Sequence, residues 1–208
     1  MTVKKAYNSW SETYDTDVNL TRDLDETATR ESLQGISYGR TLELGCGTGK
    51  NTSFLSGISE QMWAVDFSEG MISRAKEKLR SGNVTFSLAD ITKPWPFSDG
   101  TFDLIVSNLV LEHIEELDFI FSEASRTLKK GGAFFVCELH PFRQYQGKKA
   151  RFERGDKTIE IQAYVHDISD FLASSKSSRL NLKDLREWRH EKDEAQGVPR
   201  LISFRFEK

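Results

Sequence analysis

The sequence has little of what marks secreted or membrane proteins. Only two of its 208 residues are cysteine, Cys46 and Cys137, so we expect neither a disulfide framework nor a metal cluster. No stretch approaches the roughly 20 apolar residues of a membrane span, and no apolar run follows the N-terminal charges Lys4 and Lys5. These absences predict a soluble protein of the reducing cytoplasm, without a membrane span.

The chain also lacks an excess of positive charge. It has 29 Lys and Arg residues against 32 Asp and Glu residues, which gives a formal net charge of −3. Nucleic acid or an anionic membrane is therefore not expected as the main partner, although a local basic patch is compatible with this average. Internal repeats and low-complexity linkers are absent too. With 38% hydrophobic residues the chain can bury one core, which predicts a single domain and small-molecule partners.

The most informative stretch that is present is rich in glycine, Thr41-Leu42-Glu43-Leu44-Gly45-Cys46-Gly47-Thr48-Gly49. Residues 41–44 are predicted to form a short buried strand and residues 51–55 to begin a helix. Between them, the three glycines form a turn that lets a ligand approach bare backbone. This arrangement is typical of the cofactor loop of a doubly wound α/β sheet.

Two neighbours of the glycines restrict the ligand. A dinucleotide-binding loop has the pattern Gly-x-Gly-x-x-Gly, and here Lys50 stands where its third glycine belongs. Glu43 precedes the first glycine by two residues, where a carboxylate would repel a phosphate but attract a cationic ligand. A solvated strand residue is the alternative interpretation of Glu43.

Further acids follow two later predicted strands. Residues 61–65 end in Asp66, about 20 residues after the first glycine, where a carboxylate can accept one hydrogen bond from each hydroxyl of a ribose. Residues 83–88 alternate as a strand and are followed by Asp90. A lone aspartate at such a place is commonly a turn residue. Because Glu43, Asp66 and Asp90 come at successive strand ends, we predict that they belong to one ligand site.

The remaining pattern completes an alternation of strands and helices. It predicts helices over 23–32, 69–80, 115–128 and 167–175, and strands over 102–107, 133–137, 180–188 and 201–206. Lys129 to Gly132 are predicted to close the third of these helices with cations and a glycine cap. Residues 149–160 alternate as a hairpin around Arg154-Gly155-Asp156. Tyr7, Trp10 and Tyr14 are spaced to share one helical face.

Several of these runs together resemble one family. The glycine turn, Asp66-Phe67-Ser68-Glu69-Gly70-Met71, Asp90-Ile91 and the run Arg126 to Gly132 are similar to motifs of the class I S-adenosylmethionine-dependent methyltransferases, in the type 11 group that includes quinone-biosynthesis enzymes. The resemblance implies a Rossmann-like, seven-stranded, mostly parallel sheet with an antiparallel last strand. It divides the single domain into an N-terminal helical lid (1–39), a cofactor-binding core (40–138), an inserted hairpin cap for the substrate (139–178) and final strands (179–208).

The resemblance also implies S-adenosyl-L-methionine as cofactor and assigns residues to it. The expected cofactor-binding residues are Tyr14, Glu43, Gly45, Cys46, Gly47, Thr48, Gly49, Asp66, Phe67, Met71, Asp90, Ile91, Asn108, Leu109 and His113. By resemblance, Asp66 holds the ribose, whereas Asp90 and Ile91 meet the adenine. For His113, a structural hydrogen-bonding role is the alternative interpretation.

The implied reaction moves a methyl group to a small-molecule acceptor and leaves S-adenosylhomocysteine, without a metal. His140 is our candidate general base, with Glu138, Tyr145 and His166 as others, although His140 would equally suit a turn before Pro141. An Asn-Pro-Pro-Tyr motif is missing, which disfavours amide and nucleobase acceptors. Two alternatives stay open: a non-catalytic cofactor-binding module of the same fold, and a nucleotide-dependent oxidoreductase.

Overall fold

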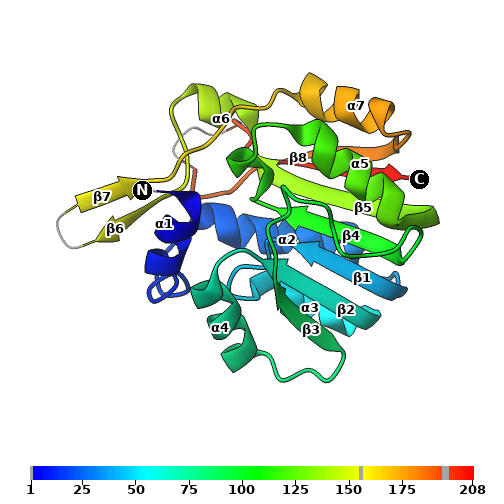
Figure 1. Ribbon diagram of the computed structural model, residues 1–208. Coiled ribbons are helices and arrows are strands. Elements are labelled where there is room, and N and C mark those ends of the chain that lie inside the picture. Colours follow the sequence, from blue (N-terminus) through cyan, green and yellow to red (C-terminus); the bar gives the residue numbers. More distant parts are fainter. Residues whose placement is uncertain (1, 155–156, 194–196) are drawn as a thin grey trace.

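A seven-stranded sheet forms the centre of the molecule (Figure 1), as seen in a computed structural model that describes residues 2–154, 157–193 and 197–208. The strands run in the order β3-β2-β1-β4-β5-β9-β8. Their bounds are β1 Tyr38–Leu44, β2 Ser59–Asp66, β3 Val84–Leu88, β4 Phe102–Asn108, β5 Leu128–Leu139, β8 Asn181–Trp188 and β9 Leu201–Glu207. All pairs are parallel except those made by β9, which is antiparallel to both neighbours. The predicted doubly wound sheet with an antiparallel last strand is confirmed.

Helices cover both faces of this sheet. Helices α2 (Leu20–Leu33), α3 (Lys50–Gly57) and α4 (Glu69–Lys78) contribute to one core, and α5 (Leu117–Thr127) and α7 (Ile168–Ser177) to the other. The central strands are therefore buried on both sides, which is why β4 and β5 carry the continuous apolar runs 104–106 and 133–137 instead of alternating. Figure 1 shows the three layers, with α5 and α7 together over the β5 and β8 side of the sheet.

The neighbouring strands β1 and β4 position the site. Strands β2 and β3 lie on one side of β1, whereas β4 and β5 lie on the other, so the chain changes direction across the sheet at β1. In open α/β sheets, ligands bind outside the carboxyl ends of the strands at such a switch point. Here those ends are the glycine turn after Leu44 and the segment after Asn108.

The N-terminal helix and a small hairpin lie at this end of the sheet. Helix α1 (Val3–Trp10) packs on α4, and β6 (Arg151–Arg154) pairs with β7 (Lys157–Glu160) as the sequence predicts; Gly155 and Asp156 at its turn lie outside the described residues. The rings of Trp10 and Phe152 stack at 5.2 Å between centroids. This contact joins α1 to the hairpin, and Figure 1 shows the two side by side. A short helix, α6 (Pro141–Tyr145), follows β5.

The end of α5 differs from the prediction. The helix ends at Thr127, and Gly131 and Gly132 lie inside β5 instead of capping the helix. Leu128 already pairs with Phe102 in the parallel ladder, so the chain is extended before it reaches the glycines. The expected glycine cap is wrong because strand pairing begins at Leu128, three residues before Gly131. No helix among the described residues is long and apolar enough to cross a membrane.

Candidate functional site

The glycine turn brings backbone to the surface of a cavity. Gly45, Gly47 and Gly49 have φ values of 66°, 53° and 84°, in the left-handed region that favours glycine. A Cβ at Gly45 would lie 2.2 Å from Cγ2 of Val110, so only glycine fits beneath that side chain. A Cβ at Gly47 would meet nothing within 4 Å, because the cavity begins there.

The cavity at the carboxyl ends of β1, β2 and β4 has a volume of about 350 Å³, and we call it the inner cavity. Most of the predicted cofactor-binding residues line it: Tyr14, Gly45, Gly47, Asp66, Phe67, Met71, Asp90, Ile91, Asn108, Leu109 and His113. The structure adds Tyr7 and Val110 among others. The sequence pattern could have identified Tyr7 as a site residue, since Tyr7 is spaced to share one helical face with Trp10 and Tyr14.

Asp66 is fixed at the end of β2 by backbone amides. Its Oδ2 accepts from the amide of Gly47 at 2.9 Å and its Oδ1 from the amide of Ser68 at 2.8 Å. Burial raises the pKa of Asp66, while these amide donors act in the opposite direction. The carboxylate therefore ties the glycine turn to the start of α4 and presents its remaining lone pairs to the inner cavity.

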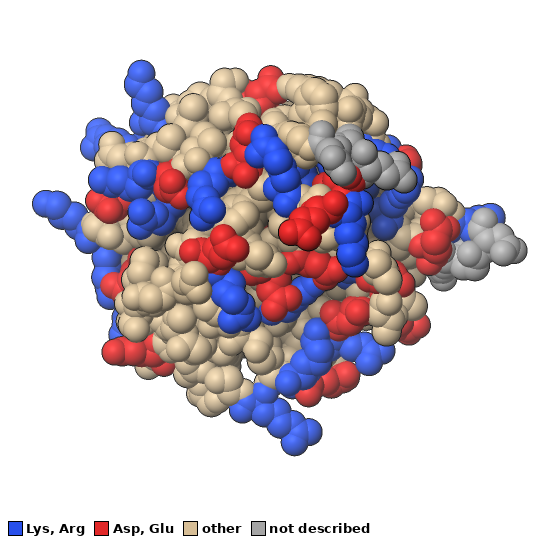
Figure 2. Space-filling view, turned by 180° about the vertical axis from the view of Figure 1, so that it is seen from behind, with Lys and Arg blue, Asp and Glu red and all other residues tan. Residues whose placement is uncertain are grey.

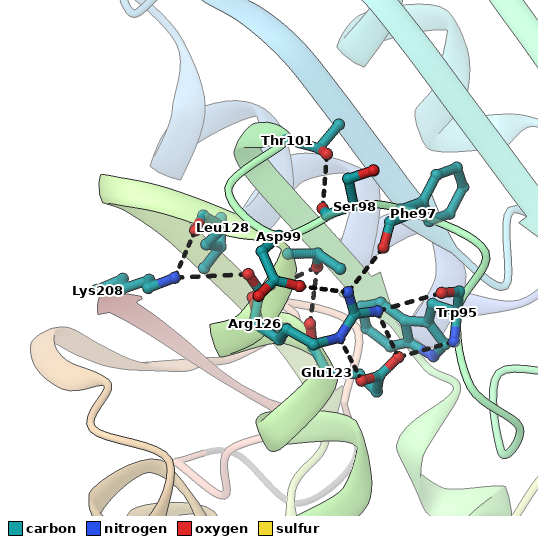
Figure 3. A network of polar contacts seen from close by, with 11 residues as sticks. Trp95, Phe97, Ser98, Asp99, Thr101, Glu123, Arg126, Leu128 and Lys208 are labelled. Atoms are coloured by element: carbon teal, nitrogen blue, oxygen red, sulfur yellow. Dashed lines mark hydrogen bonds and ion pairs between the residues drawn. The ribbon is translucent and has the colours of Figure 1, made fainter.

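The wall that carries Asp90 and Ile91 is held from α5, through contacts of Trp95 with Glu123 and Arg126 (Figure 3). The indole of Trp95 donates to the carbonyl of Ile91 at 2.9 Å, and the Trp95 amide donates to Glu123 at 2.7 Å. Arg126 donates to both oxygens of the same Glu123, at 2.7 and 2.8 Å, and to the carbonyl of Trp95 at 3.1 Å. The role of the Arg126 run is thus structural, because the hydrogen bonds of Arg126 fasten the loop that carries Trp95 to the helix.

Four of the predicted residues lie behind the cavity surface instead of on it: Glu43, Cys46, Thr48 and Gly49. Glu43 is buried under α3, where Thr52 donates to its Oε2 at 2.6 Å, and burial raises the pKa of Glu43 to about 8. Thr48 donates to Asp15 at 2.6 Å. Neither the expected direct contact of Glu43 with a ligand nor its solvated alternative matches this placement, because the strand turns the side chain into the helix layer.

A buried network that the sequence did not reveal reaches the site from α2. Asp25 accepts from Nδ2 of Asn108 at 2.6 Å and from Nδ2 of Asn51 at 2.8 Å. Burial raises the pKa of Asp25, against the effect of these amide donors. The Oδ1 atom of Asn108 is buried and has no partner among the described residues. Asn108 therefore offers an acceptor at the edge of the inner cavity, oriented by a helix far away in sequence.

Tyr7 and His113 belong to one chain of hydrogen bonds. The Nδ1 atom of His113 lies 2.7 Å from the carbonyl of Gln162, and its Nε2 lies 2.7 Å from the hydroxyl of Tyr7. A carbonyl only accepts, so Nδ1 carries the proton, Nε2 accepts and Tyr7 donates. Burial lowers the pKa of His113, which favours this neutral form. Both roles proposed for His113 meet here, since it is hydrogen-bonded and also lines the inner cavity.

A larger cavity of about 610 Å³ adjoins the first, and we call it the outer cavity. The two share Tyr7, Tyr14 and Leu109 as lining residues. Leu109 has φ 55°, an uncommon value for leucine, at the point where the cavities meet. Segments far apart in the sequence enclose the outer cavity: residues 18–22 and 146–151, together with Lys192, Asp193 and Arg200.

The structure does not bring His140 into either cavity. Its Nδ1 accepts from the amide of Phe142 at 3.1 Å, which makes it the cap of α6, and its Nε2 lies 3.3 Å from Glu187. Burial lowers the pKa of His140. His140 follows β5 at the same edge of the sheet as Asn108, as expected, but it lines neither cavity, and the alternative of a residue that orders the turn into Pro141 matches its hydrogen bond.

Glu138 and Glu112, by contrast, act next to the cavities. Glu138 accepts from the amides of Val110 and Leu111 at 3.0 and 2.9 Å and so holds the turn that follows Leu109. Burial raises the pKa of Glu138 to about 8 and that of Glu112 to about 7. Glu112 lines the outer cavity, and its Oε2 is buried without a partner among the described residues.

The inner cavity fits S-adenosylmethionine by the chemistry of its donors and acceptors. Asp66 offers carboxylate lone pairs near the exposed backbone of Gly47, and apolar side chains of Phe67, Met71 and Ile91 flank it. Asn108 adds an unpartnered acceptor. Fold and site thus define the class: a Rossmann-like protein with the strand order and antiparallel last strand of the class I methyltransferases.

Comparisons with known sequences agree. Residues 42–136 match the methyltransferase domain family. An uncharacterized methyltransferase of Emericella nidulans is 26% identical, over 87% of this chain and 76% of its own length. A demethylmenaquinone methyltransferase of Clavibacter sepedonicus is 33% identical over 54% of this chain, and a malonyl-[acyl-carrier protein] O-methyltransferase of Bacillus cytotoxicus is 32% identical over 61%. The chain covers 46% and 44% of these two relatives.

Solved structures share the fold. A methyltransferase from Listeria monocytogenes aligns with a TM-score of 0.77 at 17% identity, over 90% of this chain and 99% of the other. The N-methyltransferase NodS from Bradyrhizobium japonicum, in complex with S-adenosyl-L-homocysteine, has a TM-score of 0.76 at 16% identity, over 100% and 99%. The [4+2]-cyclase SpnF has a TM-score of 0.62 at 22% identity, over 78% and 58%. The chain is therefore similar, in its core sequence and in its whole fold, to the class I S-adenosylmethionine-dependent methyltransferases, and S-adenosylmethionine is the cofactor of this class.

Proposed function

We propose that the protein transfers a methyl group from S-adenosylmethionine, held in the inner cavity, to a small-molecule acceptor held in the outer cavity. The observation that carries this proposal is that the two cavities meet at Tyr7, Tyr14 and Leu109. When bound, the cofactor supplies an electrophilic methyl group that a nucleophile displaces from sulfur. The outer cavity lies within the size range of small-molecule sites.

In this proposal the residues of the chain bind and orient. Asp66 accepts from the ribose hydroxyls, Asp90 and Ile91 meet the adenine, and Asn108 meets the methionine part. Buried carboxylates nearby, Glu43 among them, favour a cationic ligand through their charge when ionised. Alignment of two reactants away from water can lower the activation barrier by roughly 7–11 kcal/mol, so positioning is the main task of such a site.

The N-terminal segment and the hairpin have the proposed roles of lid and cap. In the division made from the sequence, 1–39 is the lid, 40–138 the core, 139–178 the cap and 179–208 the final strands. The stacking of Trp10 on Phe152 supports a common closure of lid and cap, because it links α1 to the hairpin directly.

Two alternatives differ from this proposal in specific ways. A dinucleotide-dependent oxidoreductase would have the six-stranded parallel order 3-2-1-4-5-6, and the antiparallel β9 inserted beside β5 disfavours it. A non-methylating protein of the same fold is the stronger alternative, since a structural neighbour, SpnF, is described as a cyclase.

The test measures binding and turnover separately. At about 100 times the dissociation constant, S-adenosylhomocysteine should stabilise the fold by about 2.7 kcal/mol and raise the melting temperature by roughly 5–11 °C. NAD is the control ligand and should leave the melting temperature unchanged. Transfer of a labelled methyl group to a panel of small molecules then tests turnover. A rise with NAD alone would contradict the proposal, and binding without any methyl transfer would favour the non-methylating alternative.

A further inference from the structure

The outer cavity differs in charge from the molecule around it. Among the described residues, seven Lys or Arg side chains line it against three Asp or Glu side chains, although the whole chain has a net charge of −3. Figure 2 shows blue and red side chains interspersed over the rear face, without one sign covering it. The excess of cations around the outer cavity is therefore a local feature.

Two of the three acids are already paired. Glu160 lies 2.6 Å from Nζ of Lys149, and Asp193 lies 2.8 Å from Nη2 of Arg143 and also pairs with Arg200. Although burial acts to raise it, the pKa of Asp193 is lowered by these guanidinium groups. Exposed cations at the rim, such as Lys148, have no acid within ion-pair distance among the described residues.

The third acid, Glu112, has no such neighbour. Its side chain is 7% exposed, its Oε2 has no hydrogen-bond partner among the described residues, and it lines the outer cavity. It follows Leu109 by three residues, so it stands at the end of the outer cavity that adjoins the inner one. A buried carboxylate oxygen without a donor is costly, and a ligand that brings a donor removes that cost.

We infer that the acceptor is a small molecule with two ends: an anionic group that lies among the rim cations Lys148, Arg151 and Lys192, and an N–H or O–H nucleophile that is presented to Glu112. This inference rests on the proposed function and names the substrate class of the same site. In the transfer, the nucleophile's lone pair forms the bond to the methyl carbon, the electron pair of the broken carbon–sulfur bond stays on sulfur, and the nucleophile's proton goes to the Glu112 carboxylate.

The surroundings of Glu112 suit a proton acceptor near neutral pH. Burial raises the pKa of Glu112 to about 7, where a general base is most effective. The groups that face it are Glu138 from β5, whose Oε2 accepts the Glu112 amide at 3.4 Å, His113 at 3.8 Å and Tyr7 from α1. The Nε2 atom of His113 already accepts a hydrogen bond from Tyr7. The Oε2 atom of Glu112 therefore remains as the proton acceptor at the end of the outer cavity that adjoins the inner one.

Three small probes of nearly equal shape test the inference. They are 4-(aminomethyl)benzoate, which carries both groups, 4-methylbenzoate, which lacks the amine, and 4-methylbenzylamine, which lacks the carboxylate. Their dissociation constants are measured by calorimetry on protein saturated with S-adenosylhomocysteine, above and below pH 7. We expect 4-(aminomethyl)benzoate to bind roughly tenfold more tightly than 4-methylbenzoate, with the advantage growing as the pH rises and Glu112 ionises.

Variants separate the two ends of the cavity. Glu112→Gln keeps the shape and should remove the advantage of the amine, because a neutral amide no longer attracts the ammonium. Replacing Lys148 and Arg151 together by alanine should weaken the binding of the two carboxylate probes by only about two- to fivefold, since exposed ion pairs are weak. The affinity for 4-methylbenzylamine should not change. Lys76→Ala, an exposed lysine on α4 away from the cavity, is the matched control and should change nothing.

Either of two results would overturn the inference: no preference for the carboxylate probes, or binding of none of the three at millimolar concentration. Saturation with S-adenosylhomocysteine is established first. A protein that does not bind it contradicts the proposed function, whereas a protein that binds it and shows no preference among the probes contradicts only the acceptor class.

Discussion

The inner and outer cavities share three residues but are built in opposite ways. The inner cavity lies on the ends of parallel strands and is lined by Asp66 and Asp90 with one lysine, Lys4. The outer cavity lies between segments far apart in sequence, and cations are the majority of its charged lining residues. The difference shows how one sheet edge can offer a negative site and a positive site side by side: strand ends supply the first, and inserted segments supply the second.

The largest expected effect tests the negative site. Asp66→Ala should abolish the rise in melting temperature with S-adenosylhomocysteine, because the two charge-assisted hydrogen bonds that we propose to the ribose would amount to about 3–6 kcal/mol. Titration calorimetry and thermal denaturation measure the loss. Asp184→Ala, an exposed aspartate on β8, is the control and should bind normally. An unchanged affinity of Asp66→Ala for S-adenosylhomocysteine would contradict the proposal that Asp66 binds the ribose.

Gly45→Ala should come next in size. The new Cβ would meet Val110 at 2.2 Å at a φ of 66°, so we expect a loss of about 2–4 kcal/mol in the free energy of unfolding. Gly57→Ala, with nothing within 4 Å of its Cβ, is the matched control. Denaturant titration measures both variants. Partial rescue by Val110→Ala would identify the clash as the cause, whereas a stable Gly45→Ala protein would contradict the packing described here.

The buried acids behind the inner cavity predict a dependence on pH. In the folded protein the pKa of Glu43 is raised to about 8, so the folded state holds a proton that the unfolded state releases above about pH 4.3. The stabilisation is complete below that pH and is lost as the pH rises through about 8. We therefore expect the melting temperature to fall between about pH 5 and pH 9 in the protein without ligand.

Glu43→Gln should flatten this fall. At pH 5 the variant and the original protein should melt at similar temperatures, because the carboxyl is already neutral there. At pH 9 the variant should be more stable, by about 1.4 kcal/mol for each unit of the raised pKa that it removes. Differential scanning calorimetry across the pH range measures both. An equal slope in the two proteins would show that Glu43 does not titrate in this range.

The smallest effect concerns the wall of the inner cavity. Arg126→Met removes the hydrogen bonds to Glu123 and Trp95, but the Arg126 side chain is 31% exposed and solvent screens the pair, so we expect a loss of about 1 kcal/mol. S-adenosylhomocysteine should bind a few-fold more weakly, since Trp95 holds Ile91. Probe binding in the outer cavity should not change. An equal loss at both sites would mean that the two cavities share one support.

The sequence predicted the inner cavity well and the outer cavity hardly at all. Gly45, Asp66 and Asp90 stand at strand ends, where spacing along the chain translates directly into position on the sheet edge. Glu43 and His140 have the same kind of local signal, yet one turns under α3 and the other caps α6. Position along a strand is encoded locally, whereas the direction in which a buried side chain finds its partner depends on the layer packed against it.

The alternation of strands and helices, the glycine turn and the acids after successive strands were determined by the sequence alone, because each depends on backbone geometry over a few residues. Only the tertiary structure decided that Tyr7 meets His113, that Asp25 orients Asn108 and that Glu112 lines the same cavity as Arg151 and Lys192. These contacts join residues that are distant in sequence. Burial makes them selective, since a buried polar group without a partner costs free energy, and no local pattern states which partner it finds.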